Sequence, residues 1–313
     1  MAGEKEMAGV DFSTLPEGCI SHVLSLTSPR DACRAAIVSP VFRSAEASDT
    51  VWERFLPPDI AGILARAVDR VQYSSKRELF FRLCGDPILI DDRKMSFFLD
   101  RTTGRKCYLL SARLLTIVWG DTPSYWRWID DPNSRFSEVA ELLDVCWLEI
   151  RGQLDTKELS PHTKYVACLV FNLTETTRGL EHPSQETSVK VGAQVSSHTT
   201  CLQTIEDALA IRPRRIRLRP QGRIGLGLGM RLRRAFIEPP VPEPPEQATP
   251  ATVSTTNTVL PRKREDGWME IELGQFDTDC GDVGEVDMSF MEVKGGFWKS
   301  GLIVQGIEIR PTN

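Results

Sequence analysis

Residues 164–174 read KYVACLVFNLT, and their pattern indicates the fold class of the larger part of the chain. Tyr165, Ala167, Leu169, Phe171 and Leu173 alternate with the residues between them, and this period of two predicts a β-strand. Similar alternation occurs in 267–273, 285–290 and 301–309. Many short strands separated by Gly, Pro and Asp predict an antiparallel β-sandwich, jelly-roll-like, from residue 88 onward. One helical interruption is expected at 137–143, where Val139, Leu142 and Leu143 follow a helical spacing.

The N-terminal part of the chain has helical periodicity instead. Residues 14–17 have the spacing of a capping box, and Ile20, Val23 and Leu24 then form one apolar stripe. A second helix is expected to start at Ser28-Pro29, and a third segment spans 44–55 before Pro57-Pro58 stops it. Residues 59–84 continue helically, with apolar side chains as far as Val71 and a second capping box at 75–78.

These patterns predict an α+β protein with five segments. We expect a disordered N-terminus (1–10), a three-helix module (11–57), a helical connector (58–87), and a β-sandwich formed by 88–202 and 261–313. The sandwich is interrupted by 203–260, which is Arg-rich and then Pro-rich. Such a composition buries too little apolar surface to offset the entropy of ordering, so this insert is predicted to be disordered.

Composition limits the class of protein. The 313 residues are 41% hydrophobic and 26% charged, without the roughly 18 consecutive apolar residues that a membrane helix needs. The N-terminus lacks the apolar core of a secretory signal, and the eight cysteines lie 14 or more residues apart. We therefore expect an intracellular protein, cytoplasmic or nuclear, with free thiols and without a zinc site, a disulfide framework or a membrane contact.

The charge is distributed unevenly. Nine arginines and no acid lie between Arg212 and Arg234, so the formal charge of −5 leaves −14 on the rest of the chain. Such an acidic body is not a nucleic-acid-binding surface, and only 212–234 could make weak anionic contacts. The four histidines have neither a nucleophile nor metal-ligand spacing nearby, so we expect a non-enzyme without metal or cofactor.

Two known families are similar to parts of this sequence. Residues 12–56 resemble the F-box through Leu15-Pro16-Glu17, Val23-Leu24, Ser28-Pro29-Arg30-Asp31, Val41-Phe42 and Trp52-Glu53. About 88–200 and 263–311 resemble the plant phloem-lectin (phloem protein 2, Nictaba-like) domain. The segments that carry this resemblance include 106–108, 111–113, 119–121, 125–128, 146–152, 266–270, 284–286 and 306–311.

The F-box resemblance implies docking to a Skp-type adaptor, which would join the chain to a cullin (SCF-type) ubiquitin ligase. The apolar side chains on 11–57 are more than three short helices are expected to bury, and each one left in water forgoes roughly 1.5–3 kcal/mol. The alternative is a small helical bundle that only caps the next domain. The residues expected at the adaptor contact are Leu15, Pro16, Ile20, Leu24, Val38, Phe42 and Trp52.

The phloem-lectin resemblance implies a carbohydrate site formed by Trp119, Trp126, Glu285 and Glu292. Trp119 and Trp126 flank a turn-rich loop suited to a binding rim, although tryptophans serve more often in a core. Seven residues of strand span roughly 23 Å and reverse the facing, so the two glutamates serve one small site only if a bulge or turn intervenes. Otherwise only one of them contacts ligand. Three further tryptophans are assigned to the core or the sheet surface: Trp147, Trp268 and Trp298.

The expected function is therefore a non-catalytic substrate adaptor. Its sandwich would bind glycan-bearing cargo, such as glycoproteins with N-acetylglucosamine or N-glycan cores. Two alternatives stay open: the sandwich binds unmodified protein cargo, or the chain is a free cytoplasmic or nuclear lectin.

Overall fold

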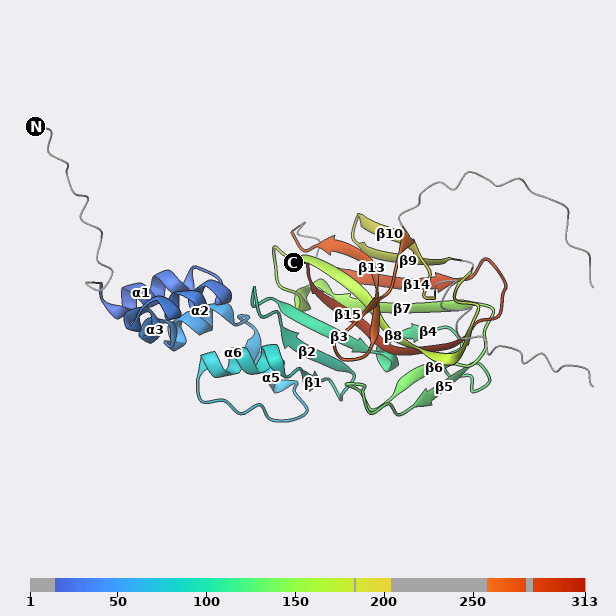
Figure 1. Ribbon diagram of the computed structural model, residues 1–313, viewed down its shortest axis with the longest axis horizontal. Helices are drawn as coiled ribbons and strands as arrows, with labels where there is room; N and C mark the ends of the chain where they lie inside the picture. Colours follow the sequence, from blue (N-terminus) through green and yellow to red (C-terminus); the bar gives the residue numbers. More distant parts are fainter. Residues whose placement is uncertain (1–14, 183, 204–257, 280–283, 313) are drawn as a thin grey trace, which may run out of the picture.

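The computed structural model describes residues 15–182, 184–203, 258–279 and 284–312 (Figure 1). A helical module lies at one end of an elongated molecule, and a body of two sheets forms the other end. The predicted N-terminal segment 1–10 and residues 204–257 of the predicted insert lie outside the described residues. No helix in the described ranges has the length and apolar character needed to cross a membrane.

The helical module has four short helices, α1 (Glu17–Ser25), α2 (Pro29–Val38), α3 (Pro40–Glu46) and α4 (Asp49–Phe55). The Ser28 hydroxyl accepts the Asp31 amide at 3.1 Å, which confirms the predicted start of the second helix. The expectation of one helical segment over 44–55 is wrong, because the chain turns between α3 and α4. At the first helix, Pro16 occupies the N-cap position expected for Thr14, which lies outside the described residues.

The interior of the module is already filled. Ile20, Leu24 and Trp52 are only 2%, 4% and 0% exposed. The Trp52 indole donates to the Glu46 carbonyl at 2.7 Å, and its ring centroid lies 5.1 Å from that of Phe80 in the connector. The expectation that these side chains remain uncovered is therefore wrong, because α1 packs against α3 and α4, and α4 packs against the connector.

The connector consists of α5 (Ile60–Ala65) and α6 (Lys76–Gly85). The Ser75 hydroxyl accepts the Glu78 amide at 3.1 Å, as the second capping box predicts. The predicted helical continuation to Val71 is wrong. The Val68 amide instead donates to the Leu89 carbonyl at 2.9 Å, so pairing with the first strand of the body ends the helix early.

Ion pairs and hydrogen bonds fix the connector to the body. Lys106, whose side chain is 5% exposed, places Nζ 2.9 Å from Asp59 at the start of the connector. Arg66 donates to both Asp91 and Glu158, with N–O distances of 2.6–3.0 Å. The Tyr108 hydroxyl donates to Glu158 at 3.1 Å. A guanidinium held by two carboxylates restricts rotation between the two ends of the molecule.

The body is a β-sandwich of two sheets. In the described part of the chain the larger sheet has nine strands, seven of them in the order β1-β2-β3-β15-β8-β13-β12, with β6 beside β15 and β5 beside β6. Their bounds are β1 Ile88–Ile90, β2 Met95–Leu99, β3 Lys106–Ser111, β5 Trp126–Ile129, β6 Val139–Leu142, β8 Lys164–Arg178, β12 Arg262–Lys263, β13 Met269–Asp277 and β15 Ser300–Pro311.

The smaller sheet has the order β11-β10-β9-β14-β7-β4. Its bounds are β4 Thr116–Ile117, β7 Leu148–Asp155, β9 Gln185–Val191, β10 Gln194–Thr200, β11 Thr258–Val259 and β14 Glu285–Glu292. All described strand pairs are antiparallel except β10 with β11, which confirms the predicted mainly antiparallel sandwich. Strand β11 falls within the predicted 203–260 insert, so that part of the disorder prediction is wrong.

Residues 164–174 belong to β8, which lies inside the larger sheet between β15 and β13. Its Tyr165, Ala167, Leu169 and Phe171 side chains join the core between the sheets. Val170 belongs to a second, smaller cluster on the outer face, with Leu109, Phe136, Val139 and Trp268. The sheets approach closely, since a Cβ added at Gly152 of β7 would lie 3.0 Å from the Ile307 side chain of β15.

The expected helix at 137–143 is a strand instead. Residues 139–142 form β6, which pairs with β15 through Ala140 and Glu141. A short apolar run is compatible with either period, and the open edge of β15 decides the outcome here.

Candidate functional site

Trp119 lies on an exposed turn directly after β4. Its backbone has a φ of +60°, and its side chain is 43% exposed. Its ring centroid lies 5.2 Å from that of Tyr125. Positive φ is uncommon for a bulky residue and concentrates at functional positions, so this turn is a candidate binding feature.

Trp126 is placed differently from Trp119. It is 2% exposed, and its indole donates to the Val118 carbonyl at 3.2 Å. Trp128 donates to the Gly120 carbonyl at 3.1 Å. These two indoles hold the backbone on both sides of Trp119, so Trp126 supports the exposed ring and does not present its own face to solvent.

Glu285 and Glu292 are not brought together. They occupy opposite ends of β14, which pairs with β7 from Glu285↔Asp155 to Glu292↔Leu148 without a register shift. Glu285 is exposed, whereas Glu292 is 4% exposed. The absence of a bulge in this strand rules out one small site that contains both carboxylates.

Glu292 instead clamps two loops from inside the fold. Its Oε1 accepts the backbone amides of Lys294 and Gly295 at 3.2 and 2.8 Å, and its carboxylate pairs with buried Lys299. The Lys299 ammonium also donates to the carbonyls of Cys146 and Phe297 at 3.1 and 2.7 Å. The buried pair therefore fixes the chain after β14 against the chain before β7.

Both clamped loops carry exposed aromatic side chains next to the Trp119 turn. Trp147, Phe297 and Trp298 are 43%, 56% and 52% exposed. The Val118 amide donates to the Glu149 carbonyl at 3.1 Å, and Val145 forms a bridge with Lys299, so the three segments meet at one end of the sandwich. We call this set the aromatic rim: Trp119, Trp147, Phe297 and Trp298.

Sequence reasoning missed part of this rim. Trp268 is fully buried, as assigned, but Trp147 and Trp298 stand at the surface of loops. The Gly295-Gly296 pair before Phe297 is the one sequence signal of a turn that could have identified the second loop.

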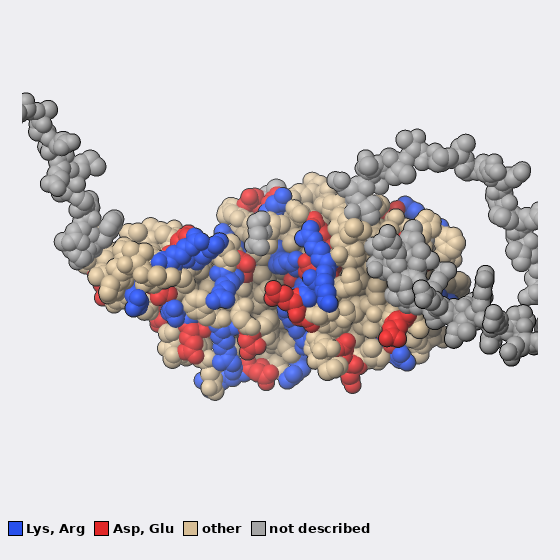
Figure 2. Space-filling model, viewed as in Figure 1, with Lys and Arg blue, Asp and Glu red and all other residues tan. Residues whose placement is uncertain are grey.

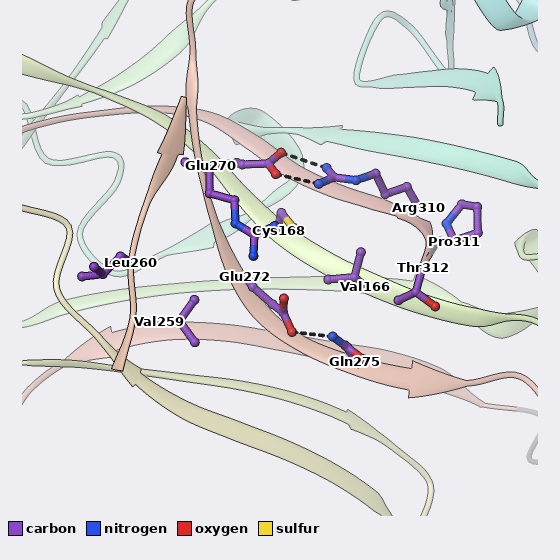
Figure 3. Close-up of a pocket in the computed structure, with 11 residues that line it drawn as sticks. Val166, Cys168, Val259, Leu260, Glu270, Glu272, Gln275, Arg310, Pro311 and Thr312 are labelled. Carbon is purple, nitrogen blue, oxygen red and sulfur yellow. Dashed lines mark hydrogen bonds and ion pairs between the residues drawn. The ribbon is translucent and has the colours of Figure 1, made fainter. Parts of the chain in front are cut away.

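The outer face of the larger sheet contains a cavity of about 330 Å³ (Figure 3). Figure 3 shows Arg310 paired with Glu270, and Gln275 with Glu272, across its wall. Arg264 joins the same network by donating to Glu270 and to Glu308 at 2.9 Å each. These charges are satisfied by one another, which favours a structural role for this face.

Two pKa shifts support a structural role for the outer face of the larger sheet. Burial raises the pKa of the Cys168 thiol to about 12, so the thiol is protonated near neutral pH and is a poor nucleophile. Burial alone would raise the pKa of the Glu308 carboxyl, but the hydrogen bond and charge of Arg264, together with Arg310, hold it below its usual value. Within the described residues, no three His, Cys, Asp or Glu side chains gather as metal ligands would.

The helical module exposes an apolar surface of its own. Val23, Leu26, Ile37 and Val38 are 56%, 64%, 79% and 78% exposed, and Leu15 is 39% exposed. Along α1 and its C-cap residue, Cys19, Val23 and Leu26 follow a helical spacing on a different side from buried Ile20 and Leu24. A helix with apolar side chains on two sides is typical of a helix that packs against other protein surfaces on both sides. On the face shown in Figure 2, basic and acidic side chains are interspersed over the module and the centre of the molecule.

Comparisons with known proteins agree with this architecture. The family model for phloem protein 2 matches residues 105–311, which is most of the sandwich. The Arabidopsis thaliana F-box protein PP2-B10 is 43% identical over 303 residues, covering 96% of this chain and 94% of that protein. The chain belongs to the plant F-box proteins that carry a phloem protein 2 domain.

Further relatives of this family match over nearly the whole chain. The F-box protein PP2-B1 is 39% identical over 308 residues, and the F-box protein VBF is 38% identical over 299 residues, both from Arabidopsis thaliana. The matches cover 96% and 95% of this chain, and 90% and 98% of the two relatives. In this phloem protein 2 family member, the matched domain contains every residue of the aromatic rim.

Proposed function

We propose that the chain is the substrate-recognition subunit of an SCF-type cullin ubiquitin ligase. The observation that carries the proposal is that Val23 of α1 and Leu26 at its C-cap stay exposed although the interior of the module is filled by other side chains. Exposed apolar side chains on a small helical module indicate a protein partner. By family membership, that partner is a Skp-type adaptor held by a cullin scaffold.

The structure supports a division of roles among the expected contact residues. Leu15, Pro16 and Val38 are exposed and available for direct contact, and Phe42 is half-buried. Three residues lie inside the module and would act by holding the helices in place: Ile20, Leu24 and Trp52. The subunit itself is non-catalytic in this proposal, because it only raises the local concentration of cargo near the ubiquitin-carrying enzyme.

For cargo, we propose that the sandwich binds glycans that contain N-acetylglucosamine. Support comes from Trp119, a rigidly held and exposed indole on a turn, in a domain of the phloem-lectin family. Sugar rings present apolar C–H faces that stack on aromatic rings, and their hydroxyls need polar partners nearby. The exposure of Phe297 and Trp298 favours a second candidate, the recognition of unmodified protein cargo, because aromatic side chains are enriched in protein interfaces. A free lectin, the remaining alternative, would bind the sugar but not the Skp-type adaptor.

Adaptor docking is tested by binding of the full chain to a recombinant Skp-type adaptor, measured by calorimetry. Val23→Asp is expected to weaken binding roughly ten- to hundredfold, since a buried apolar side chain contributes roughly 1.5–3 kcal/mol. Val195→Asp is the matched control, because Val195 is 65% exposed on β10 of the sandwich. Equal affinity of the Val23→Asp protein and the control would refute the docking proposal.

Glycan binding is tested on an array with the same full-length protein. Binding to N-acetylglucosamine oligomers or N-glycan cores that is lost in Trp119→Ala is the expected result. If no glycan is bound but a protein cargo is captured through the aromatic rim, the second candidate function replaces the first.

A further inference from the structure

The outer face of the smaller sheet contains a cavity of about 600 Å³ that none of the four expected carbohydrate residues lines. It lies over β9, β10 and β14, and its volume is within the range of small-molecule sites. Six of its lining residues are Glu186, Ser188, Ser197, Thr199, Ser289 and Met291.

Strand register explains why these side chains gather. Ser197 of β10 pairs with Ser188 of β9, which pairs with Ser289 of β14, so three hydroxyls form a row across the sheet. The Oγ atoms of Ser188 and Ser289 are 2.8 Å apart. Paired residues in neighbouring strands point to the same face, and here that face is the outer one.

A second row lies beside the first. Thr199 pairs with Glu186, and Glu186 pairs with Met291. The Glu186 carboxylate makes an ion pair with Lys294, which belongs to the loop that carries Phe297 and Trp298. The cavity is therefore connected to the aromatic rim through this loop.

The rim also reaches the cavity through β7. Met291 pairs with Glu149, and the Trp147 indole donates to the Glu149 carboxylate at 2.8 Å. Two strand spacings, about 10 Å, separate β9 from β7. A ligand that contacts both the hydroxyl rows and Trp147 must be longer than one sugar ring.

The charge of this cavity distinguishes it from other hollows on the molecule. The cavity on the larger sheet is lined by paired guanidinium and carboxylate groups. A groove of about 700 Å³ at the joint between module and body is lined by four cations and one carboxylate: Arg54, Arg105, Lys106, Lys157 and Asp59. In the cavity on the smaller sheet, the outward-facing side chains supply four hydroxyls, a thioether and a carboxylate paired with Lys294, and Thr187 and His198 complete the lining. This set suits an uncharged ligand with many hydroxyl groups.

We infer that the hydroxyl rows and Trp147 form one extended subsite for an oligosaccharide. The inference deepens the proposed glycan binding and rests on it. The serine and threonine hydroxyls both donate and accept, as sugar hydroxyls do, and Met291 with Trp147 supplies the apolar contacts. The cavity would take one sugar residue, and Trp147 would stack on a neighbouring one.

The test measures chitotriose and the N-glycan core pentasaccharide binding to the full chain by calorimetry. Ser188→Leu fills the cavity and is expected to weaken binding at least about tenfold, because buried polar groups of the sugar lose their partners. Lys190→Leu is the matched control, since Lys190 is the next outward-facing residue of β9, is exposed, and does not line the cavity. Its affinity should stay within about twofold of the wild type, as for other surface changes.

A second variant removes the hydroxyls without adding bulk. Ser188→Ala/Ser289→Ala should weaken binding by several-fold while the melting temperature stays unchanged, which separates recognition from misfolding. Wild-type affinity in both cavity variants, with binding lost in Trp119→Ala, overturns the subsite but leaves the glycan proposal intact. A wild-type chain that binds neither sugar overturns both.

Discussion

The two outer faces of the sandwich are built from different side chains. On the larger sheet, a buried cluster around Trp268 and a network of Arg264, Glu270, Glu308 and Arg310 satisfy the face internally. On the smaller sheet, rows of hydroxyl side chains and the nearby aromatic rim remain open to solvent. Groups that are already paired have few hydrogen bonds left for a ligand, so the first face stabilises the fold, and the second is the one that we propose for recognition.

The largest expected effect is the difference in stability between variants of buried Trp126 and exposed Trp119. Trp126→Ala should lower the free energy of unfolding by about 3–5 kcal/mol, because it removes a buried ring and its hydrogen bond. Trp119→Ala should change stability by about 0.5 kcal/mol or less while abolishing glycan binding. Urea denaturation and calorimetry of both proteins measure the two quantities. Similar unfolding curves for the two variants would contradict the assignment.

A smaller difference is expected between the two sheet faces themselves. Glu308→Ala should destabilise the protein by about 3 kcal/mol, since it leaves two arginines without their shared buried carboxylate. Ser289→Ala, at an outward position of the smaller sheet, should cost no more than about 0.5 kcal/mol. Denaturant midpoints at neutral pH give the comparison. Comparable costs for both would mean that the faces do not differ as described.

Acid should reduce the stability that the charged outer face of the larger sheet contributes. The pKa of Glu308 is lowered in the folded protein, so its contribution to stability is present above the unfolded pKa and disappears as the pH falls through the folded value. The acid limb of the stability profile should therefore be flatter in Glu308→Gln than in the wild type. Unfolding measured from pH 7 to pH 3 provides the test, and parallel profiles would count against this role.

The smallest effect concerns the thiol at the cavity of the larger sheet. A pKa of about 12 for Cys168 leaves roughly one thiolate in ten thousand at pH 8. Iodoacetamide should therefore modify exposed Cys19 far sooner than Cys168, as followed by mass spectrometry of peptides. Rapid modification of Cys168 in the folded protein would show that its thiol is accessible to solvent, which would contradict the buried environment described for it.

Local patterns predicted most of the architecture. Serine hydroxyls cap two helices where the sequence places them, and the alternating stretches became β8, β13, β14 and β15. The failures lie where local patterns are ambiguous. Residues 137–143 and 66–71 fit a helical spacing, but the backbone of a neighbouring strand was available for pairing, and those hydrogen bonds decide the outcome.

The candidate site was less accessible to sequence reasoning. The turn-rich loop in the sequence pointed to Trp119 as a binding residue. The number of residues between Glu285 and Glu292 predicted that a regular strand would hold them too far apart for one small site. The sequence could not show that Trp126 is buried, that Glu292 clamps two loops, or that Trp147 and Trp298 are exposed. Each of these depends on segments distant in the chain, such as the bridge between Val145 and Lys299.

Local apolar periodicity was therefore enough to predict the type and order of most elements, because the period of apolar residues is a property of neighbouring residues. The sequence also carried the resemblance that placed the chain among the F-box proteins with a phloem protein 2 domain. Which side of each element stays exposed, in contrast, follows from the packing of the folded chain. Exposure depends on what packs against a surface, and in the sandwich partners such as β3 with β15 and β7 with β14 are far apart in the sequence.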